Sequence, residues 1–212
     1  MFHGKGRDDL GFTGVGGIAG TMSFGSVHLI FNAIREIIGN QPYEFIDLGA
    51  GTGVMVMMSF AFGAVYACGV EYQPSSLGFV FDAARDAASK SLGIHIDSTM
   101  IKFDTNITSL GEMITLSSNT LLPQIVFCFC DGWNEYEREH VFHLISISSR
   151  VKIFICSTGR GAGDKFSTPI SILNALNASL GISTKFAYDR HIAVKMFGHR
   201  GAKKTIRVFV RQ

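Results

Sequence analysis

The sequence predicts an α/β protein: a sheet of five parallel strands, closed by a C-terminal antiparallel hairpin, with helices on both faces. Three observations lead to this fold class. Short apolar runs alternate with segments of helical period along most of the chain. After Gly181 two β-rich segments follow each other without a helix between them. With 212 residues and 47% hydrophobic content, the chain is long enough for one well-buried core.

The parallel strands are predicted from apolar runs bounded by polar or turn-forming residues. They span residues 43–47, 65–71, 99–104, 124–130 and 151–156. Helices are predicted at residues 23–38, 74–92, 134–149 and 167–180, and the apolar run at 54–70 is expected to hold a helix followed by a strand. Because a helical crossover returns the chain in the same direction, the five strands are expected to be parallel.

The C-terminal part of the chain has a different pattern. Two β-rich segments, residues 183–196 and 204–211, flank a turn-rich stretch at 197–202. Since no helix fits between them, the two segments are expected to pair antiparallel at the end of the sheet.

The N-terminal residues 1–22 are rich in glycine and lack hydrophobic periodicity. They are predicted to form a flexible arm ahead of a single domain at residues 23–212. The four cysteines lie in apolar segments without C-x-x-C spacing or a secretory signal in front of them. We therefore expect an intracellular protein with reduced core cysteines and no membrane span.

A glycine-rich turn follows the first strand in the stretch FIDLGAGTGVMV, residues 45–56. Glycines at a strand end let the backbone approach a ligand closely, and the next helix offers free amide groups. The spacing of Gly49, Gly51 and Gly53 is G-x-G-x-G, whereas a dinucleotide fingerprint is G-x-G-x-x-G. Asp47 would repel a pyrophosphate, but its carboxylate can hold the cationic aminoacyl end of S-adenosylmethionine.

Two further strand ends carry an acid. Glu71 ends the second strand, where a carboxylate can accept the hydroxyl groups of a ribose, and Asp104 ends the third, where it can bind the adenine amino group. Three acids at successive strand ends favour a positively charged nucleoside ligand. The alternative is that the glycine turn is structural and the acids cap helices.

The motif from Asp47 to Gly53, followed by Gly69, Val70 and Glu71, resembles the first two motifs of class I S-adenosylmethionine-dependent methyltransferases. Asp104 matches the adenine-binding acid of that family. The resemblance extends over residues 23–212 and implies a Rossmann-like sheet, S-adenosylmethionine as the cofactor and methyl transfer as the activity.

In this family the end of the fourth strand faces the acceptor atom, which is the stretch Cys130-Asp-Gly-Trp-Asn134 here. It has no proline pair, so methylation of a base amino group is disfavoured. Asp131 can orient or deprotonate an acceptor, or it can cap the following helix. Trp133 can stack on a base, line a lysine channel or close the end of the sheet. His140 and His143 are expected to be ordinary helix residues, so no metal is predicted.

Basic residues gather near the C-terminus and predict a polyanion-facing hairpin, with a solvated edge strand as the alternative. The cations named for this surface are Lys203, Lys204, Arg207 and Arg211. The loop at 20–25 and the glycine turn also resemble the non-SET histone lysine methyltransferases, which act on the nucleosome core. In that family the loop carries an acid, which is absent from Phe24-Gly25-Ser26.

The sequence therefore predicts a methyltransferase that acts on a macromolecule, preferably a histone lysine, with Phe24, Asp131 and Trp133 lining the acceptor entrance. A histone substrate would imply a nuclear location. Two alternatives remain open at this point: an RNA methyltransferase, and a non-catalytic methyltransferase-like subunit that binds nucleic acid.

Overall fold

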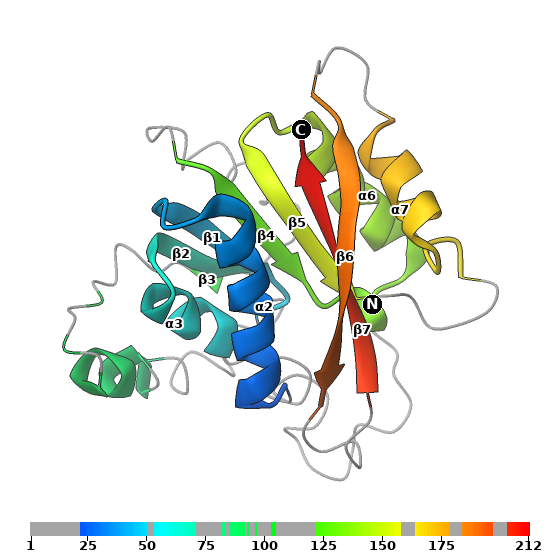
Figure 1. The fold of residues 1–212 in the computed structure, drawn as a ribbon. Helices are drawn as coiled ribbons and strands as arrows, with labels where there is room; N and C mark the ends of the chain where they lie inside the picture. The colour runs from blue at the N-terminus through cyan, green and yellow to red at the C-terminus, as the bar shows by residue number, and fades with distance from the viewer. Residues whose placement is uncertain are drawn as a thin grey trace, which may run out of the picture.

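The structure is a computed structural model that describes residues 22–50, 53–70, 82–83, 85–91, 93, 96, 103–104, 122–157, 164–178, 184–196 and 203–212. Within these residues one seven-stranded sheet has the order β3-β2-β1-β4-β5-β7-β6 (Figure 1). The strands are β1 (Tyr43–Leu48), β2 (Ala64–Val70), β3 (Phe103–Asp104), β4 (Gln124–Cys128), β5 (Val151–Ser157), β6 (Phe186–Lys195) and β7 (Lys203–Arg211).

The helices of the described part are α2 (Phe24–Ile38), α3 (Val54–Ala61), the short 3-10 turn η3 (Cys130–Gly132), α6 (Glu135–Ile147) and α7 (Pro169–Leu176). Residues 82–83 and 85–91 are also helical, inside the helix predicted at 74–92. The predicted fourth strand was too long, because the chain leaves the sheet after Cys128 and turns into η3.

The strand pairings confirm the predicted fold class. Strands β1 to β5 are joined by parallel pairings, whereas β7 pairs antiparallel with both β5 and β6. The hairpin turns back so that its second strand, β7, lies next to β5 and its first strand forms the sheet edge. The carboxyl ends of β1, β4, β5 and β6 therefore lie at one edge of the sheet.

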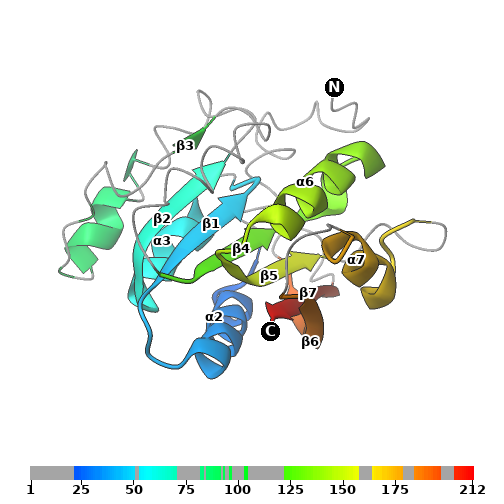
Figure 2. The ribbon, with the colours of Figure 1, turned by 90° about the horizontal axis from the view of Figure 1, so that it is seen from above.

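Helices cover both faces of the sheet, as predicted, and enclose two hydrophobic cores (Figure 2). One core contains side chains of α2 and α3, and the other contains side chains of α6 and α7. Every residue of β1 and of β4 is buried. Burial on both faces explains why these strands appear in the sequence as continuous apolar runs rather than alternating ones.

The starts of α6 and α7 are fixed by reciprocal capping boxes. Asn134 Oδ1 accepts from the Glu137 amide at 2.9 Å, and Glu137 Oε2 accepts from the Asn134 amide at 2.8 Å. Thr168 and Ser171 form the second box, with Pro169 at the first helical position. Each box satisfies backbone donors that a helix start leaves unpaired. The chain thus begins both helices at defined residues after β4 and β5.

Helix α2 is attached to the end of the hairpin. The Ser23 amide donates to Lys195 O at 3.0 Å, and the Lys195 amide donates to Ser26 Oγ at 2.7 Å. Met22 is buried and forms an isolated bridge with Met196. The first turn of α2 therefore lies at the sheet edge that carries the strand ends. Residues 1–21 of the predicted arm lie outside the described residues.

All four cysteines are buried and free of disulfides, as expected for core residues. None of the described helices is long and apolar enough to cross a membrane.

Candidate active site

The glycine turn after β1 lies against the end of β2. The amides of Gly49 and Ala50 both donate to Val70 O, at 2.8 and 3.0 Å. Gly49 has φ +80° and Gly53 has φ +75°, a backbone conformation that residues with a Cβ rarely adopt. The two glycines are thus required by the path of the chain from β1 into α3.

Asp47 lies one residue before the end of β1, between Gly69 of β2 and Phe127 of β4. The residue is only 1% exposed, so its carboxylate is held inside the strand ends rather than in solvent. A buried carboxylate is costly without a polar or charged neighbour. Its placement next to the glycine turn is the arrangement that the sequence predicted.

The start of α3 offers backbone groups to a ligand. Its N-cap is Gly53, whose position has no capping side chain, and the first turn contains no acid. The first amides of a helix lack intrahelical partners, and the helix dipole places partial positive charge there. This end of α3 is therefore suited to an anionic group such as a carboxylate.

These residues fit the aminoacyl end of S-adenosylmethionine, which carries an ammonium and a carboxylate. Asp47 matches the ammonium, and the uncapped start of α3 matches the carboxylate. Gly51 and Glu71 lie outside the described residues. Asp104 lies in β3, where its backbone pairs with Val70 near the same edge, and its side chain is outside the described part.

Trp133 packs against the glycine turn. A Cβ added at Gly49 would lie 3.4 Å from Cζ2 of the indole, and the tryptophan is 9% exposed. The structure therefore brings together a predicted cofactor residue and a predicted acceptor residue. Trp133 also belongs to the core between the sheet and α6, so it closes the end of the sheet while lining the turn.

Asp131 lies in η3, immediately after β4, and its Oδ2 accepts from Lys204 Nζ at 2.8 Å. The alternative that Asp131 caps the next helix is wrong, because Asn134 is the N-cap of α6. This leaves an acceptor-side role for Asp131 as the prediction. The contact with β7 was not predicted, since 73 residues separate the two partners in sequence.

Phe24 is the first residue of α2 and lies at the same sheet edge. Its side chain is 70% exposed, so it packs little against the described part of the chain. A role for Phe24 at the acceptor entrance stays a prediction.

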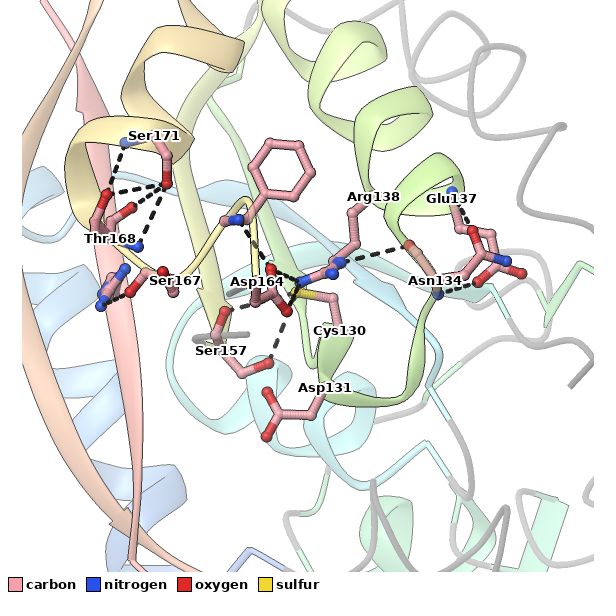
Figure 3. A network of polar contacts seen from close by, with 12 residues as sticks. Cys130, Asp131, Asn134, Glu137, Arg138, Ser157, Asp164, Ser167, Thr168 and Ser171 are labelled. Atoms are coloured by element: carbon pink, nitrogen blue, oxygen red, sulfur yellow. Dashed lines mark hydrogen bonds and ion pairs between the residues drawn. The ribbon is translucent and has the colours of Figure 1, made fainter. Parts of the chain in front are cut away.

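A buried ion pair ties the segment after β4 to the segment after β5 (Figure 3). Arg138 Nη1 contacts both carboxylate oxygens of Asp164, at 2.8 and 2.9 Å, and both side chains are buried. Asp164 Oδ1 also accepts from the Phe166 amide at 2.9 Å. This pair could not be predicted from the sequence, because Arg138 fits the polar pattern of an amphipathic helix and its partner follows the next strand.

The cysteines near this network lie at the ends of β4 and β5. Burial raises the pKa values of the Cys128 and Cys156 thiols, which keeps them neutral. Cys130 donates from its sulfur to Ser157 O at 3.6 Å. Within the described residues no group of three or more His, Cys, Asp and Glu side chains is placed to hold a metal ion.

The prediction that the hairpin cations share one polyanion-facing surface is wrong for Arg211. That residue is buried and its guanidinium donates to five backbone carbonyls, those of Ile145, Ser146, Ser148, Val151 and Thr184. Arg207 donates to Ser167 O at 2.7 Å, and Lys204 contacts Asp131. Lys203 is exposed at the end of the hairpin where β6 leads into β7.

Comparison with solved structures finds methyltransferases. The magnesium protoporphyrin IX methyltransferase of Synechocystis PCC 6803, with bound SAH, gives a TM-score of 0.57 at 14% identity, covering 89% of this chain and 83% of that one. A proposed RNA methyltransferase from Pyrococcus horikoshii gives 0.54 at 10% identity, with coverages of 88% and 82%. The methyltransferase domain of bacterial CtHen1 gives 0.52 at 13% identity, with coverages of 87% and 96%.

The chain has the fold of the class I S-adenosylmethionine-dependent methyltransferases, as the sequence resemblance implied. No protein-family model matches the chain, and the curated proteins contain no sequence detectably similar to it. At identities of 10–14% the likeness establishes the fold, so the activity depends on the residues of the site.

Proposed function

We propose that the protein is an S-adenosylmethionine-dependent methyltransferase that acts on a macromolecule, with a protein lysine as the acceptor and a histone lysine as the first candidate. The observation that carries the proposal is the position of buried Asp47 beside Gly49 and the uncapped start of α3. These groups lie together at the edge of the sheet where the parallel strands have their carboxyl ends.

When bound, S-adenosylmethionine supplies a methyl group on a positively charged sulfur. Asp47 would hold the ammonium of its aminoacyl end, and the first amides of α3 would hold the carboxylate. Glu71 and Asp104 are proposed to bind the ribose and the adenine, as the family resemblance implies. Gly49, Gly51 and Gly53 would allow the backbone to approach the ligand.

A lysine acceptor is supported by the chemistry next to Trp133. Asp131 already contacts a primary ammonium group in the structure, that of Lys204, at 2.8 Å. A carboxylate beside an aromatic wall suits a lysine, because both groups attract its ammonium and the carboxylate can accept the proton that the ammonium must lose before methyl transfer. Methyl transfer needs alignment of an unprotonated amine with the methyl carbon and exclusion of water, which are tasks for positioned side chains.

A macromolecular substrate is supported by two lysines at the end of the hairpin where β6 leads into β7. Lys195 and Lys203 are directly opposite in the β6–β7 pairing, and both are exposed. Like charges opposite each other destabilise a sheet, so an anionic partner would relieve a repulsion that folding creates. Neither ammonium has a partner among the described residues. The choice of a histone rests on the sequence resemblance.

RNA is the second candidate substrate, because the same pair of lysines suits a phosphate backbone. Both candidates are tested by transfer of labelled methyl from S-adenosylmethionine to reconstituted nucleosomes and to total RNA in parallel. Label that protease removes from nucleosomes is the expected result. Label that only ribonuclease removes would replace the lysine assignment with RNA, and label in neither would contradict the proposal of a macromolecular methyltransferase.

Cofactor binding is tested separately with Asp47→Asn. Because a charge-assisted bond is lost, the variant is expected to bind S-adenosylhomocysteine about 10- to 100-fold more weakly in calorimetry. Glu44→Gln is the matched control, since Glu44 is buried in the same strand and pairs with Arg150 at 3.0 Å at the opposite end. The control should lose stability and keep its affinity for the cofactor product.

A wild-type protein that folds but gains no thermal stability from saturating S-adenosylhomocysteine would favour the non-catalytic subunit, because a ligand that binds only the folded state raises Tm. Equal affinities of wild type and Asp47→Asn would remove Asp47 from the proposed cofactor site.

A further inference from the structure

We infer that Lys204 is a positioning residue that orients Asp131 at the acceptor side of the site, and not a contact for a polyanion. The inference rests on the proposed function and deepens it, because it assigns one of the hairpin cations to the reaction. Its basis is the 2.8 Å contact between Lys204 Nζ and Asp131 Oδ2.

The contact crosses the end of a strand. Lys204 is the second residue of β7, which pairs with β5, and Asp131 lies in η3 after β4, the strand on the other side of β5. The side chain of Lys204 therefore spans the carboxyl end of β5 to reach Asp131. The Asp131 side chain is 13% exposed against 44% for Lys204, so the carboxylate end of the pair is sheltered from solvent.

Residues on both sides of Asp131 have side-chain contacts of their own. Cys130 donates to Ser157 O, and Trp133 packs on Gly49. By contacting Oδ2, Lys204 restricts the rotation of the carboxylate and so the directions in which Oδ1 can point. An acceptor group that contacts this carboxylate would then meet it in one orientation, which is the condition for productive alignment.

Lys203 provides a natural comparison within the same strand. Successive residues of a strand point to opposite faces. Lys203 is opposite Lys195 in the β6–β7 pairing, whereas Lys204 is opposite Val194 and contacts Asp131. The two adjacent lysines thus have different surroundings despite identical chemistry. Lys204 is expected to affect the rate of methyl transfer, and Lys203 the binding of an anionic substrate.

The experiment compares Lys204→Met with Lys203→Met in steady-state methyl transfer to reconstituted nucleosomes, with total RNA as the second probe. Lys204→Met is expected to lower kcat on the order of 10-fold or more, because misplacement of a catalytic side chain carries a cost of that size. Lys203→Met is expected to raise KM for the nucleosome with a smaller effect on kcat. Calorimetry with S-adenosylhomocysteine should give unchanged affinity in both variants.

A conservative variant separates orientation from folding. Lys204→Arg keeps a cation that can reach Asp131 and should recover most of kcat, whereas Lys204→Met should not. In a double-mutant cycle, Asp131→Asn and Lys204→Met should have less than additive effects on kcat, because each removes the same contact. A purely structural role for Lys204 would change Tm without this coupling in kcat.

The outcomes distinguish the two proposals. A wild-type protein that labels neither probe would overturn the proposed function and this inference with it. Label transfer by the wild type with an unchanged kcat in Lys204→Met would overturn the inference alone. Equal shifts of KM in Lys204→Met and Lys203→Met, with no change in kcat, would return Lys204 to the polyanion-binding surface.

Discussion

The glycine turn and the C-terminal hairpin carry the two main functional predictions, and their side chains behave differently in the structure. At the turn, Asp47, Gly49 and Gly53 occupy the positions expected from their order in the sequence. In the hairpin, Arg211 is buried, and Lys204 contacts Asp131, which lies after β4 on the other side of β5. The cations that the sequence assigned to one surface therefore differ in role: one is structural, and another contacts a residue of the candidate site.

The difference follows from how each region is determined. The turn is set by backbone requirements that involve neighbouring residues: two positive φ angles and bonds to the adjacent strand end. The function of a hairpin cation depends on which group its long side chain reaches, and that group comes from another element. The charge of a strand residue therefore predicts its role less well than a glycine motif predicts the conformation of a turn.

The largest expected effect is a loss of stability when the buried hairpin residue Arg211 is replaced. Arg211→Met would remove the side-chain donor from the carbonyls of Ile145, Ser146 and Ser148 at the end of α6, which has no basic residue of its own in the last turn. Burial lowers the pKa of Arg211, and the carbonyls with the Phe186 ring compensate the buried charge. The free energy of unfolding in urea should fall by about 3–5 kcal/mol.

Arg190→Met is the matched control for Arg211, because Arg190 lies on the same hairpin but forms exposed ion pairs with Glu36 and Asp189. Exposed pairs of this kind contribute about 0–1 kcal/mol. If the two variants lose equal stability, the distinction between a buried structural cation and a surface cation in this hairpin is wrong.

A smaller effect on stability is expected at the glycine turn, where function should change more. Gly49→Ala places a Cβ at φ +80° and 3.4 Å from Trp133, and Gly39→Ala places one at φ +68° with no atom within 4 Å. Both variants should lose about 1–2 kcal/mol of unfolding free energy from the backbone conformation. Only Gly49→Ala should weaken the binding of S-adenosylhomocysteine, measured by calorimetry, because only Gly49 lies beside Asp47.

The glycine comparison has a clear negative outcome. If Gly39→Ala weakens the binding of S-adenosylhomocysteine as much as Gly49→Ala does, the loss of affinity reflects general destabilisation. The glycine turn would then not be a ligand contact.

The parts of the fold that the sequence predicted depend on local patterns. The apolar runs gave the strands, and the change of pattern after Gly181 gave the hairpin. The end of β4 was placed too late, because Phe129 and Cys130 are as apolar and buried as the strand although they have left it. These two residues are buried without belonging to the strand, and hydrophobicity indicates only burial.

The site was predictable to the same extent. Asp47 and Gly49 could be assigned because the motif itself specifies their neighbours. The Arg138–Asp164 pair and the Lys204 contact could not, since each joins side chains from elements that become neighbours only when the sheet forms. Trp133 was assigned to the acceptor side, but its packing on Gly49 required the three-dimensional structure.

The smallest expected effect concerns the two lysines that remain available to an anionic partner. Lys203→Glu replaces a repulsive cross-strand pair with an attractive one, so the free energy of unfolding should rise by about 0.2–1 kcal/mol. The same change should weaken binding to nucleosomes, because a positive charge near phosphates is reversed. Opposite signs for stability and binding would separate a functional charge from a structural one.

The salt dependence of Lys203→Glu completes this test. Since each phosphate contact contributes to the slope of log affinity against log salt concentration, the slope should be shallower for the variant by about one unit. Lys185→Glu, in the exposed residue just before β6 at the far end of the hairpin, is the control and should leave the slope unchanged. Identical slopes for wild type and Lys203→Glu would mean that Lys203 touches no phosphate. The end of the hairpin that carries Lys203 would then be a solvated surface, as in the alternative first predicted for the hairpin, and substrate recognition would have to lie with the residues around Asp131.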